Sequence, residues 1–224
     1  MSDVTTQFLP GWNPVKASHA LDGNPDRLRQ FYQKWASRYD EDVRDQGYVA
    51  PEFMANLLQD LEGREGLTLD TDDRELPILD AGCGTGLVGI ALRNLGYANV
   101  EGFDLSEEMA GSAARTGAYR TVRGGIDICK PLDVYDDEQF AAVICCGVFT
   151  LGHVSPSALR KLVPITRRGG VIQVSTRKSY YEESSFAPEC RAMEKEGLVT
   201  RIGSVMNGPY IDEEDAHYWV LRRN

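Results

Sequence analysis

The strongest constraint on the fold of this chain lies at residues 77–86, Pro-Ile-Leu-Asp-Ala-Gly-Cys-Gly-Thr-Gly. A short apolar run ends at Asp80, glycine then occupies every second position, and a helical pattern of apolar residues begins at Leu87. Glycine permits positive φ angles and lets a ligand approach bare backbone, and the N-terminus of the following helix offers unpaired N–H groups. A strand, a glycine-rich turn and a helix in this order predict a nucleotide-type binding loop.

From residue 77 onward, strand patterns alternate with helical patterns. This alternation, with short connections, predicts an α/β fold with an open, mainly parallel sheet and helices on both faces. In such a sheet the ligand lies at the carboxyl ends of the strands. The expected strands are 77–82, 99–104, 120–126, 140–148, 171–176 and a hairpin-like pair at 199–206 and 216–222, joined by Asn207-Gly208-Pro209 and an acidic loop; the expected helices are 86–95, one capped by Ser106, one from Ser155-Pro156 to 167–170, and 188–196.

The N-terminal part of the chain predicts an arm and a helical cap, residues 1–62, placed before a core at 77–224 within a single domain. Asn followed by Pro is a typical helix start, and the apolar residues after it recur at helical spacing with an aromatic face. The expected elements are a loose arm over 1–23, one amphipathic helix from Asn24-Pro25 to Gly47, a second helix from Pro51, and a polar loop over 62–76.

Composition narrows the possible partners and the compartment. The formal net charge is −10 over 224 residues, and such a surface disfavours nucleic acid and anionic membranes, which attract basic proteins. The five cysteines show no Cys-x-x-Cys spacing, so we expect free thiols in a reducing compartment. The three histidines are scattered, and no metal site is expected. With no signal peptide or long apolar segment, the chain is expected to be cytoplasmic.

Three carboxylates at expected strand ends indicate what the loop binds. Asp80 and Asp104 lie at the ends of the first two strands, and Asp127 follows the third. An acidic residue about 20 positions after a glycine loop is well placed to accept both hydroxyls of a ribose. A dinucleotide loop needs G-x-G-x-x-G, but here the third glycine comes one position early, at Gly86. The Gly-Lys-Ser/Thr of a phosphate loop is also absent. The ligand is therefore expected to carry a ribose without a pyrophosphate.

The pattern Asp80-x-Gly82-x-Gly84-x-Gly86, followed by Asp104, resembles the signature of class I S-adenosylmethionine-dependent methyltransferases. Within them the chain resembles the methyltransferase-like protein 27 (Williams–Beuren region) group in four further stretches. The resemblance implies a Rossmann-like, doubly wound sheet of seven strands, mostly parallel, with a reversed C-terminal strand. The resembling stretches are 39–43 with Gly47-Tyr48, 78–89, 102–106 and 147–154.

The resemblance also implies roles for individual residues around S-adenosyl-L-methionine, which would leave as S-adenosyl-L-homocysteine. Asp104 would bind the ribose hydroxyls, Asp127 would accept from the adenine amino group, and Asp80 would orient the loop and the methionine amino group. Tyr39 would cover the methionine moiety, although packing in the core explains it equally well. The full cofactor set is Tyr39, Asp80, Gly82, Cys83, Gly84, Gly86, Asp104, Leu105, Met109, Asp127, Ile128, Cys146 and Gly147.

The methyl acceptor is less constrained by the sequence. His153 is the histidine expected at the mouth of the site, where it could act as a base, donate to the substrate, or simply shape its loop through backbone bonds. Arg177 and Tyr180, after the fifth strand, could meet a carboxylate or an aromatic substrate. Tyr32 and Trp35 of the cap could close the pocket.

We therefore expect methyl transfer to an N, O or S atom of a small molecule, because the chain shows neither a basic stripe nor an added recognition domain. Two other functions stay open. One is a non-catalytic module that binds S-adenosylmethionine or S-adenosylhomocysteine. The other is an NAD-dependent oxidoreductase, which the glycine spacing disfavours. The oligomeric state is left open.

Overall fold

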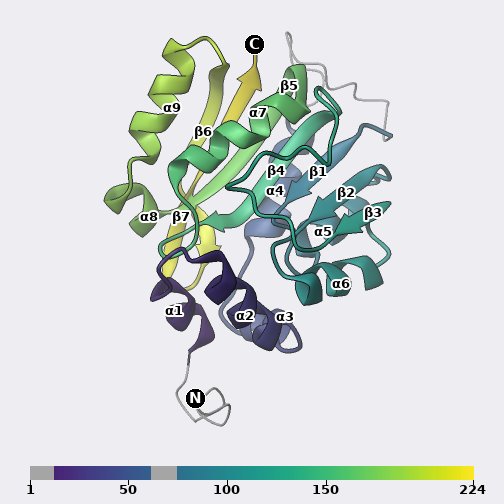
Figure 1. Cartoon of the computed structure of the whole chain (residues 1–224), viewed down its shortest axis with the longest axis vertical. Helices are drawn as coiled ribbons and strands as arrows, with labels where there is room; N and C mark the ends of the chain where they lie inside the picture. The colour runs from purple at the N-terminus through teal and green to yellow at the C-terminus, as the bar shows by residue number, and fades with distance from the viewer. Residues whose placement is uncertain (1–12, 62–74) are drawn as a thin grey trace.

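The computed structural model of the chain describes residues 13–61 and 75–224, and its centre is a seven-stranded sheet in the order β3-β2-β1-β4-β5-β7-β6 (Figure 1). The strands β1 to β5 pair in parallel, and β7 runs antiparallel to both β5 and β6. The expected Rossmann-like sheet with one reversed strand near the C-terminus is confirmed. The strands are β1 (Ile78–Ala81), β2 (Val100–Phe103), β3 (Thr121–Arg123), β4 (Phe140–Phe149), β5 (Thr166–Arg177), β6 (Val199–Ile211) and β7 (Glu214–Arg223).

Helices cover both faces of the sheet because its central strands bury side chains on both sides. Ile78 and Leu79 are neighbours on β1, and they point into two different apolar clusters, one on each face. The helices α4 and α5 contribute to the first cluster, and η2, α7 and α9 to the second. The helices are α1 (Pro14–His19), α2 (Pro25–Trp35), α3 (Tyr39–Arg44), α4 (Ala50–Gln59), α5 (Leu87–Asn94), α6 (Glu107–Arg115), the 3₁₀-helix η2 (Pro156–Lys161), α7 (Leu162–Ile165), α8 (Lys178–Glu183) and α9 (Phe186–Lys195).

The order of the strands locates the binding crevice. The chain moves outward from β1 to β2 and β3, and then returns to place β4 on the other side of β1. A ligand in a sheet of this kind binds at the carboxyl ends of the strands, next to this reversal. The helices α1, α2 and α3 lie together at one end of the sheet in Figure 1. None of the helices described has the length and apolar character needed to cross a bilayer.

The N-terminal cap differs from its prediction in two places. Residues 14–19 of the expected arm form α1, because Asn13 caps this helix through its side chain, with Pro14 at the first position. The expected single helix from Asn24-Pro25 to Gly47 is two helices, α2 and α3. The chain turns after Trp35, whose indole N–H donates to Asp42 Oδ2 at 2.7 Å. Residues 1–12 and 62–74 of the expected arm and loop lie outside the described residues.

Two further differences concern the second half of the sheet. Residues 167–170, expected as the end of a helix, belong to β5. Pairing of Phe140 with Thr166 and of Ala142 with Val171 leaves these four residues as a bulge, where Gly169 has a φ of +73°. Residues 207–209, expected as a turn, lie within β6, and the chain turns at 212–213 instead. The helix α8 was not expected.

Candidate functional site

The glycine loop after β1 brings bare backbone to the carboxyl end of the sheet. Gly82 and Gly84 have φ angles of +79° and +53°, which L side chains rarely adopt. A Cβ on Gly82 would lie 2.4 Å from Cγ2 of Val148, whereas a Cβ on Gly84 would meet nothing within 4 Å. Gly82 is therefore required by the closeness of Val148, near the end of β4. Gly84 is required by its backbone conformation and lies beside open space.

Asp104, directly after β2, is tied to this loop. Its Oδ2 accepts from the N–H of Gly84 at 2.9 Å, and its Oδ1 accepts from the N–H of Ser106 at 2.8 Å. Burial raises the pKa of Asp104 to about 6, although these backbone N–H groups act to lower it. A carboxylate offers about four acceptor positions, so Asp104 retains acceptor capacity for hydroxyl donors in addition to these two bonds.

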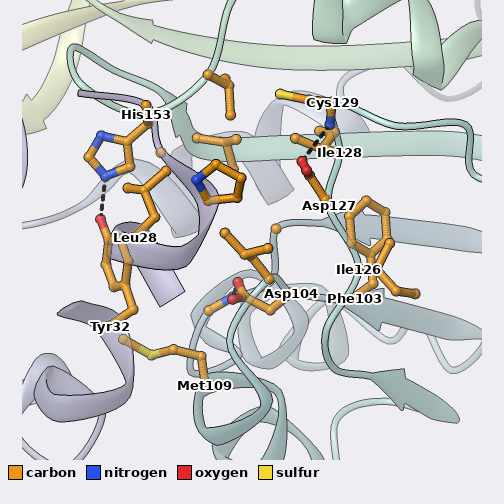
Figure 2. Close-up of a pocket in the computed structure, with 18 of the residues that line it drawn as sticks. Leu28, Tyr32, Phe103, Asp104, Met109, Ile126, Asp127, Ile128, Cys129 and His153 are labelled. Carbon is orange, nitrogen blue, oxygen red and sulfur yellow. Dashed lines mark hydrogen bonds between the residues drawn. The ribbon is translucent and has the colours of Figure 1, made fainter. Parts of the chain in front are cut away.

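A cavity of about 190 Å³, called here the main cavity, lies between the loops after β1, β2 and β4 and the helix α2. Figure 2 shows Asp104 and Met109 along the lower edge of the cavity, Tyr32 and His153 on one side, and Asp127 and Ile128 on the other. The lining residues are Gly23, Pro25, Leu28, Tyr32, Tyr39, Gly82, Gly84, Phe103, Asp104, Leu105, Met109, Ile126, Asp127, Ile128, Cys129, Cys146, Gly147, Val148, His153 and Val154.

Most of the residues expected to bind the cofactor line this main cavity, and three do not. Asp80 is fully buried beneath the loop, and Gly86 stands at the N-cap of α5 with a φ of +102°. Cys83 lines a smaller neighbouring cavity together with Gly82 and Gly84. These three residues therefore shape the loop from behind.

Tyr119, which the sequence did not suggest, holds Asp80 in place. Its hydroxyl donates to Asp80 Oδ2 at 2.6 Å and accepts from the N–H of Gly89 at 3.0 Å. The other oxygen of Asp80, Oδ1, is buried and has no hydrogen-bond partner among the residues that the structure describes. Burial raises the pKa of Asp80 to about 7, against the lowering effect of the Tyr119 hydrogen bond.

Three glycines make room for the Tyr119 ring. A Cβ on Gly89 would lie 2.2 Å from Cζ, one on Gly102 would lie 3.0 Å from Cε1, and one on Gly86 would lie 3.1 Å from Cε2. A glycine inside a helix and another inside a strand often mark close packing. Gly89 and Gly102 could therefore have indicated, from the sequence, that a bulky side chain packs behind the glycine loop.

Asp127 forms a local turn and also borders the main cavity. Its Oδ1 accepts from the N–H of Cys129 at 2.9 Å, which is an Asx-turn, and its Oδ2 lies 3.9 Å from Nζ of Lys130. The residue also lines the main cavity, opposite the cap. The Asx-turn is therefore compatible with a place for Asp127 in the wall of the cavity.

The cap closes the cavity through His153. Nε2 of His153 lies 2.7 Å from the hydroxyl of Tyr32, and Nδ1 lies 2.9 Å from the carbonyl oxygen of Leu151. A carbonyl can only accept, so Nδ1 carries the proton and Nε2 accepts from Tyr32. Gly23 adds a second link, since its N–H donates to the carbonyl of Gly152 at 2.9 Å.

A second hollow of about 40 Å³, called here the cap cavity, adjoins the main cavity. Tyr32, Tyr39 and Gly147 line both. Of the residues expected at the substrate, Trp35 and Arg177 lie here, whereas Tyr180 lines neither cavity and donates its hydroxyl to the carbonyl of Val154 at 2.9 Å. The lining residues are Val15, Ser18, Tyr32, Trp35, Tyr39, Val43, Tyr48, Gly147, Thr150, Arg177, Tyr210 and Ile211.

Two tyrosines of the cap cavity were not expected at the site. The hydroxyl of Tyr48 lies 3.4 Å from Sγ of Cys146, and its ring meets the Tyr210 ring edge-on at 5.1 Å. Tyr48 follows a helix and Tyr210 lies on β6, a strand expected to end before it. No spacing in the sequence links the two, so tertiary structure alone brings them together.

Comparisons with known proteins agree on one class of domain. A family model described as a methyltransferase domain matches residues 78–170. Methyltransferase-like protein 27 of Homo sapiens is 33% identical over 168 residues, which cover 73% of this chain and 62% of that protein. Malonyl-[acyl-carrier protein] O-methyltransferase of Pectobacterium atrosepticum is 37% identical over 122 residues, 53% of this chain and 46% of that protein. The chain thus spans less than two thirds of the length of either relative.

Solved structures share the fold over nearly the whole chain. A TehB-like S-adenosylmethionine-dependent methyltransferase from Corynebacterium glutamicum has a TM-score of 0.61 at 19% identity, covering 90% of this chain and 100% of that one. Magnesium protoporphyrin IX methyltransferase from Synechocystis, solved with bound S-adenosylhomocysteine, has a TM-score of 0.63 at 16% identity, covering 89% and 99%. At these identities the likeness concerns the fold.

Proposed function

Since this chain belongs to the class I S-adenosylmethionine-dependent methyltransferases, we propose that it transfers a methyl group from S-adenosyl-L-methionine to an N, O or S atom of a small molecule. The observation that carries this proposal is the position of Asp104. The residue directly follows the C-terminal end of β2, and its carboxylate accepts a hydrogen bond from the N–H of Gly84 in the glycine loop. Asp104 also lines the main cavity.

The residues present fit this cofactor. Asp104 has remaining acceptor positions for the two ribose hydroxyls. The apolar side chains of Leu105, Met109 and Ile128 line the same cavity and suit the flat faces of adenine, while Asp127 supplies an acceptor for its amino group. The cavity has no lysine among the described residues that line it, as expected for a ligand without phosphate.

The methionine end has its own partners. Gly82 and Gly147 expose backbone without a side chain, and Cys146 lies beside them in the main cavity. Asp80 holds the loop from behind through Tyr119. Its Oδ1, which has no partner within residues 13–61 and 75–224, is a buried acceptor at this end of the sheet. An ammonium group approaching the loop would be attracted by this carboxylate.

The bound cofactor would supply a methyl group on a positively charged sulfur, which is a good leaving group. The chain would then contribute position and exclusion of water, since Tyr32 and Tyr39 cover the cavity from the cap. A base role for His153 stays a prediction. In the structure Nε2 already accepts from Tyr32, so His153 could take a proton only through Tyr32 or after that bond opens.

A small acceptor is supported by the size of the cap cavity and by its position under the cap helices. The test is a transfer assay with labelled S-adenosylmethionine and a metabolite extract separated into small-molecule and protein fractions. We expect label in the small-molecule fraction, and no label with an Asp104→Ala variant. Label confined to protein would contradict the small-molecule proposal, and a chain that binds the cofactor but labels neither fraction would favour the non-catalytic binding module.

A further inference from the structure

We propose that the cap cavity binds a small carboxylic acid and that a carboxylate oxygen of this acid is the atom that takes the methyl group. This inference rests on the proposed function and names its substrate class. The cap cavity shares Tyr32, Tyr39 and Gly147 with the main cavity, so an occupant would lie directly beside a cofactor held there.

A guanidinium in the wall of the cap cavity can donate hydrogen bonds to an anion. Arg177 is the one charged side chain among the described residues that line it, and it is only 5% exposed. Glu214, which does not line the cap cavity, holds the guanidinium of Arg177 in place. Oε2 of Glu214 lies 2.6 Å from Nε and 2.5 Å from Nη2 of Arg177. An ammonium acceptor would need a carboxylate in the wall, whereas a carboxylate is the group that a buried arginine recognises.

A second group in the wall lacks a partner. Thr150 is 4% exposed, lines the cap cavity, and its Oγ1 is buried without a hydrogen-bond partner among the described residues. Buried hydroxyls are almost always bonded, so a hydroxyl without such a bond, on a residue that lines a cavity, is a candidate donor to a ligand there. Together, Thr150 and Arg177 supply two donors to one small anion.

The side chains around the site favour an acceptor that has no proton to lose. Burial raises the pKa of Tyr39, Tyr48 and Tyr210, so these hydroxyls stay protonated at neutral pH. His153, in the wall of the neighbouring main cavity, uses both ring nitrogens, one toward Leu151 and one toward Tyr32. An amine or a hydroxyl acceptor would have to lose a proton, but a carboxylate is already ionised at neutral pH.

The reaction balances without proton transfer. A carboxylate oxygen forms a bond to the methyl carbon while the bond from that carbon to sulfur breaks, and the electron pair remains on sulfur. The products are a methyl ester and S-adenosylhomocysteine. The rings of Tyr32, Trp35 and Tyr39 lie within 4.7–6.4 Å of one another between centroids and would contact the apolar body of the acid.

The test uses the full chain saturated with S-adenosylhomocysteine and three probes of similar shape: benzoate, benzamide and benzylamine. Calorimetry should show that benzoate binds about tenfold or more tightly than benzamide, and that benzylamine does not bind. Arg177→Gln should weaken benzoate by about tenfold or more, and Thr150→Val by a few fold. Arg201→Gln removes an arginine that lies over Trp219, outside the cavity, and should leave benzoate binding unchanged.

Affinity for S-adenosylhomocysteine is measured separately on every variant. Loss of this affinity would count against the fold of a variant or, in the unmodified chain, against the proposed function, whereas loss of acid binding alone would count against the further inference. Equal binding of the acid and the amide, tighter binding of the amine, or no binding of the acid would overturn the inference. If benzoate is methylated, the label should be released as methanol by mild alkali. Label that survives alkali would place the methyl on another atom and would also overturn it.

Discussion

The hydroxyl of Tyr32 on α2 lies 2.7 Å from Nε2 of His153 in the loop after β4. This bond joins the cap to the loop after β4 at one side of the main cavity (Figure 2). Because Nδ1 of His153 donates to the carbonyl of Leu151, the ring is fixed in the orientation that accepts from Tyr32. Together with the backbone bond from Gly23 to Gly152, this bond links the cap to the loop after β4, and one substitution removes it.

Tyr32→Phe should accelerate release of S-adenosylhomocysteine, because the cap loses its bond to His153. We expect a few-fold to tenfold faster dissociation in stopped-flow measurements and a stability loss of about 1 kcal/mol. The matched control is Tyr218→Phe, which likewise removes a hydrogen-bonded tyrosine hydroxyl. The Tyr218 hydroxyl donates to the carbonyl of Pro209, and Tyr218 lines neither cavity. If both variants release the ligand at the wild-type rate, the bond does not hold the cap.

Asp104→Ala should remove charge-assisted hydrogen bonds to the ribose hydroxyls. We expect a loss of about 2–4 kcal/mol in the free energy of S-adenosylhomocysteine binding, measured by calorimetry. Asp133→Ala, which changes an exposed carboxylate outside the main cavity, is the control for net charge. An unchanged dissociation constant for Asp104→Ala would remove this residue from the site.

Gly89→Ala should destabilise the fold even though alanine is the better helix former. Its Cβ would lie 2.2 Å from Cζ of Tyr119, so either the ring or α5 must move. Gly111→Ala, in the interior of α6, meets no atom closer than 3.6 Å and should stabilise by roughly 0.5–1 kcal/mol. Urea unfolding of both variants checks the opposite signs, and stabilisation by both would show that Tyr119 yields without cost.

Stability and cofactor binding should respond to pH in opposite directions. Burial raises the pKa of Asp80 to about 7 and of Asp104 to about 6, both from 3.8, so between these limits the folded chain binds more protons than the unfolded chain. The contribution of the two carboxyls to the free energy of unfolding therefore rises as the pH falls from about 8 to about 5.

Cofactor affinity should fall over the same range, because Asp104 accepts from ribose hydroxyls on both oxygens only when ionised. Below pH about 6, affinity for S-adenosylhomocysteine should drop by up to about tenfold per pH unit. Asp104→Asn should bind more weakly and with less dependence on pH. Calorimetry from pH 8 to pH 5 checks this, and a wild-type affinity that stays constant would contradict the pKa assigned to Asp104.

The part of the fold that follows local rules was predictable. The Ser106 cap of α6 agrees with the structure, and both ends of β1 and of β2 lie one residue inside their expected bounds. Glycine spacing, apolar runs and capping residues act within a few positions, so the sequence reveals them. The helix α1 was equally accessible, since Asn13-Pro14 repeats the signal recognised at Asn24-Pro25.

The rest depends on contacts between distant residues. The chain leaves the helical path after Trp35 where its indole bonds Asp42, and no propensity in residues 36–38 announces that turn. Tyr119 lies 39 positions from the Asp80 that it holds. The cap cavity gathers Arg177 and Tyr210 from two strands against the cap, so its composition emerges only once the sheet order is known.

The most direct test of the central claim is calorimetry of the unmodified chain with S-adenosylmethionine, S-adenosylhomocysteine and NAD. A site with a ribose acceptor at Asp104, adenine contacts and no phosphate partners should bind the first two and show no heat with NAD. Tight binding of NAD, or the absence of binding by both sulfur compounds, would contradict the account.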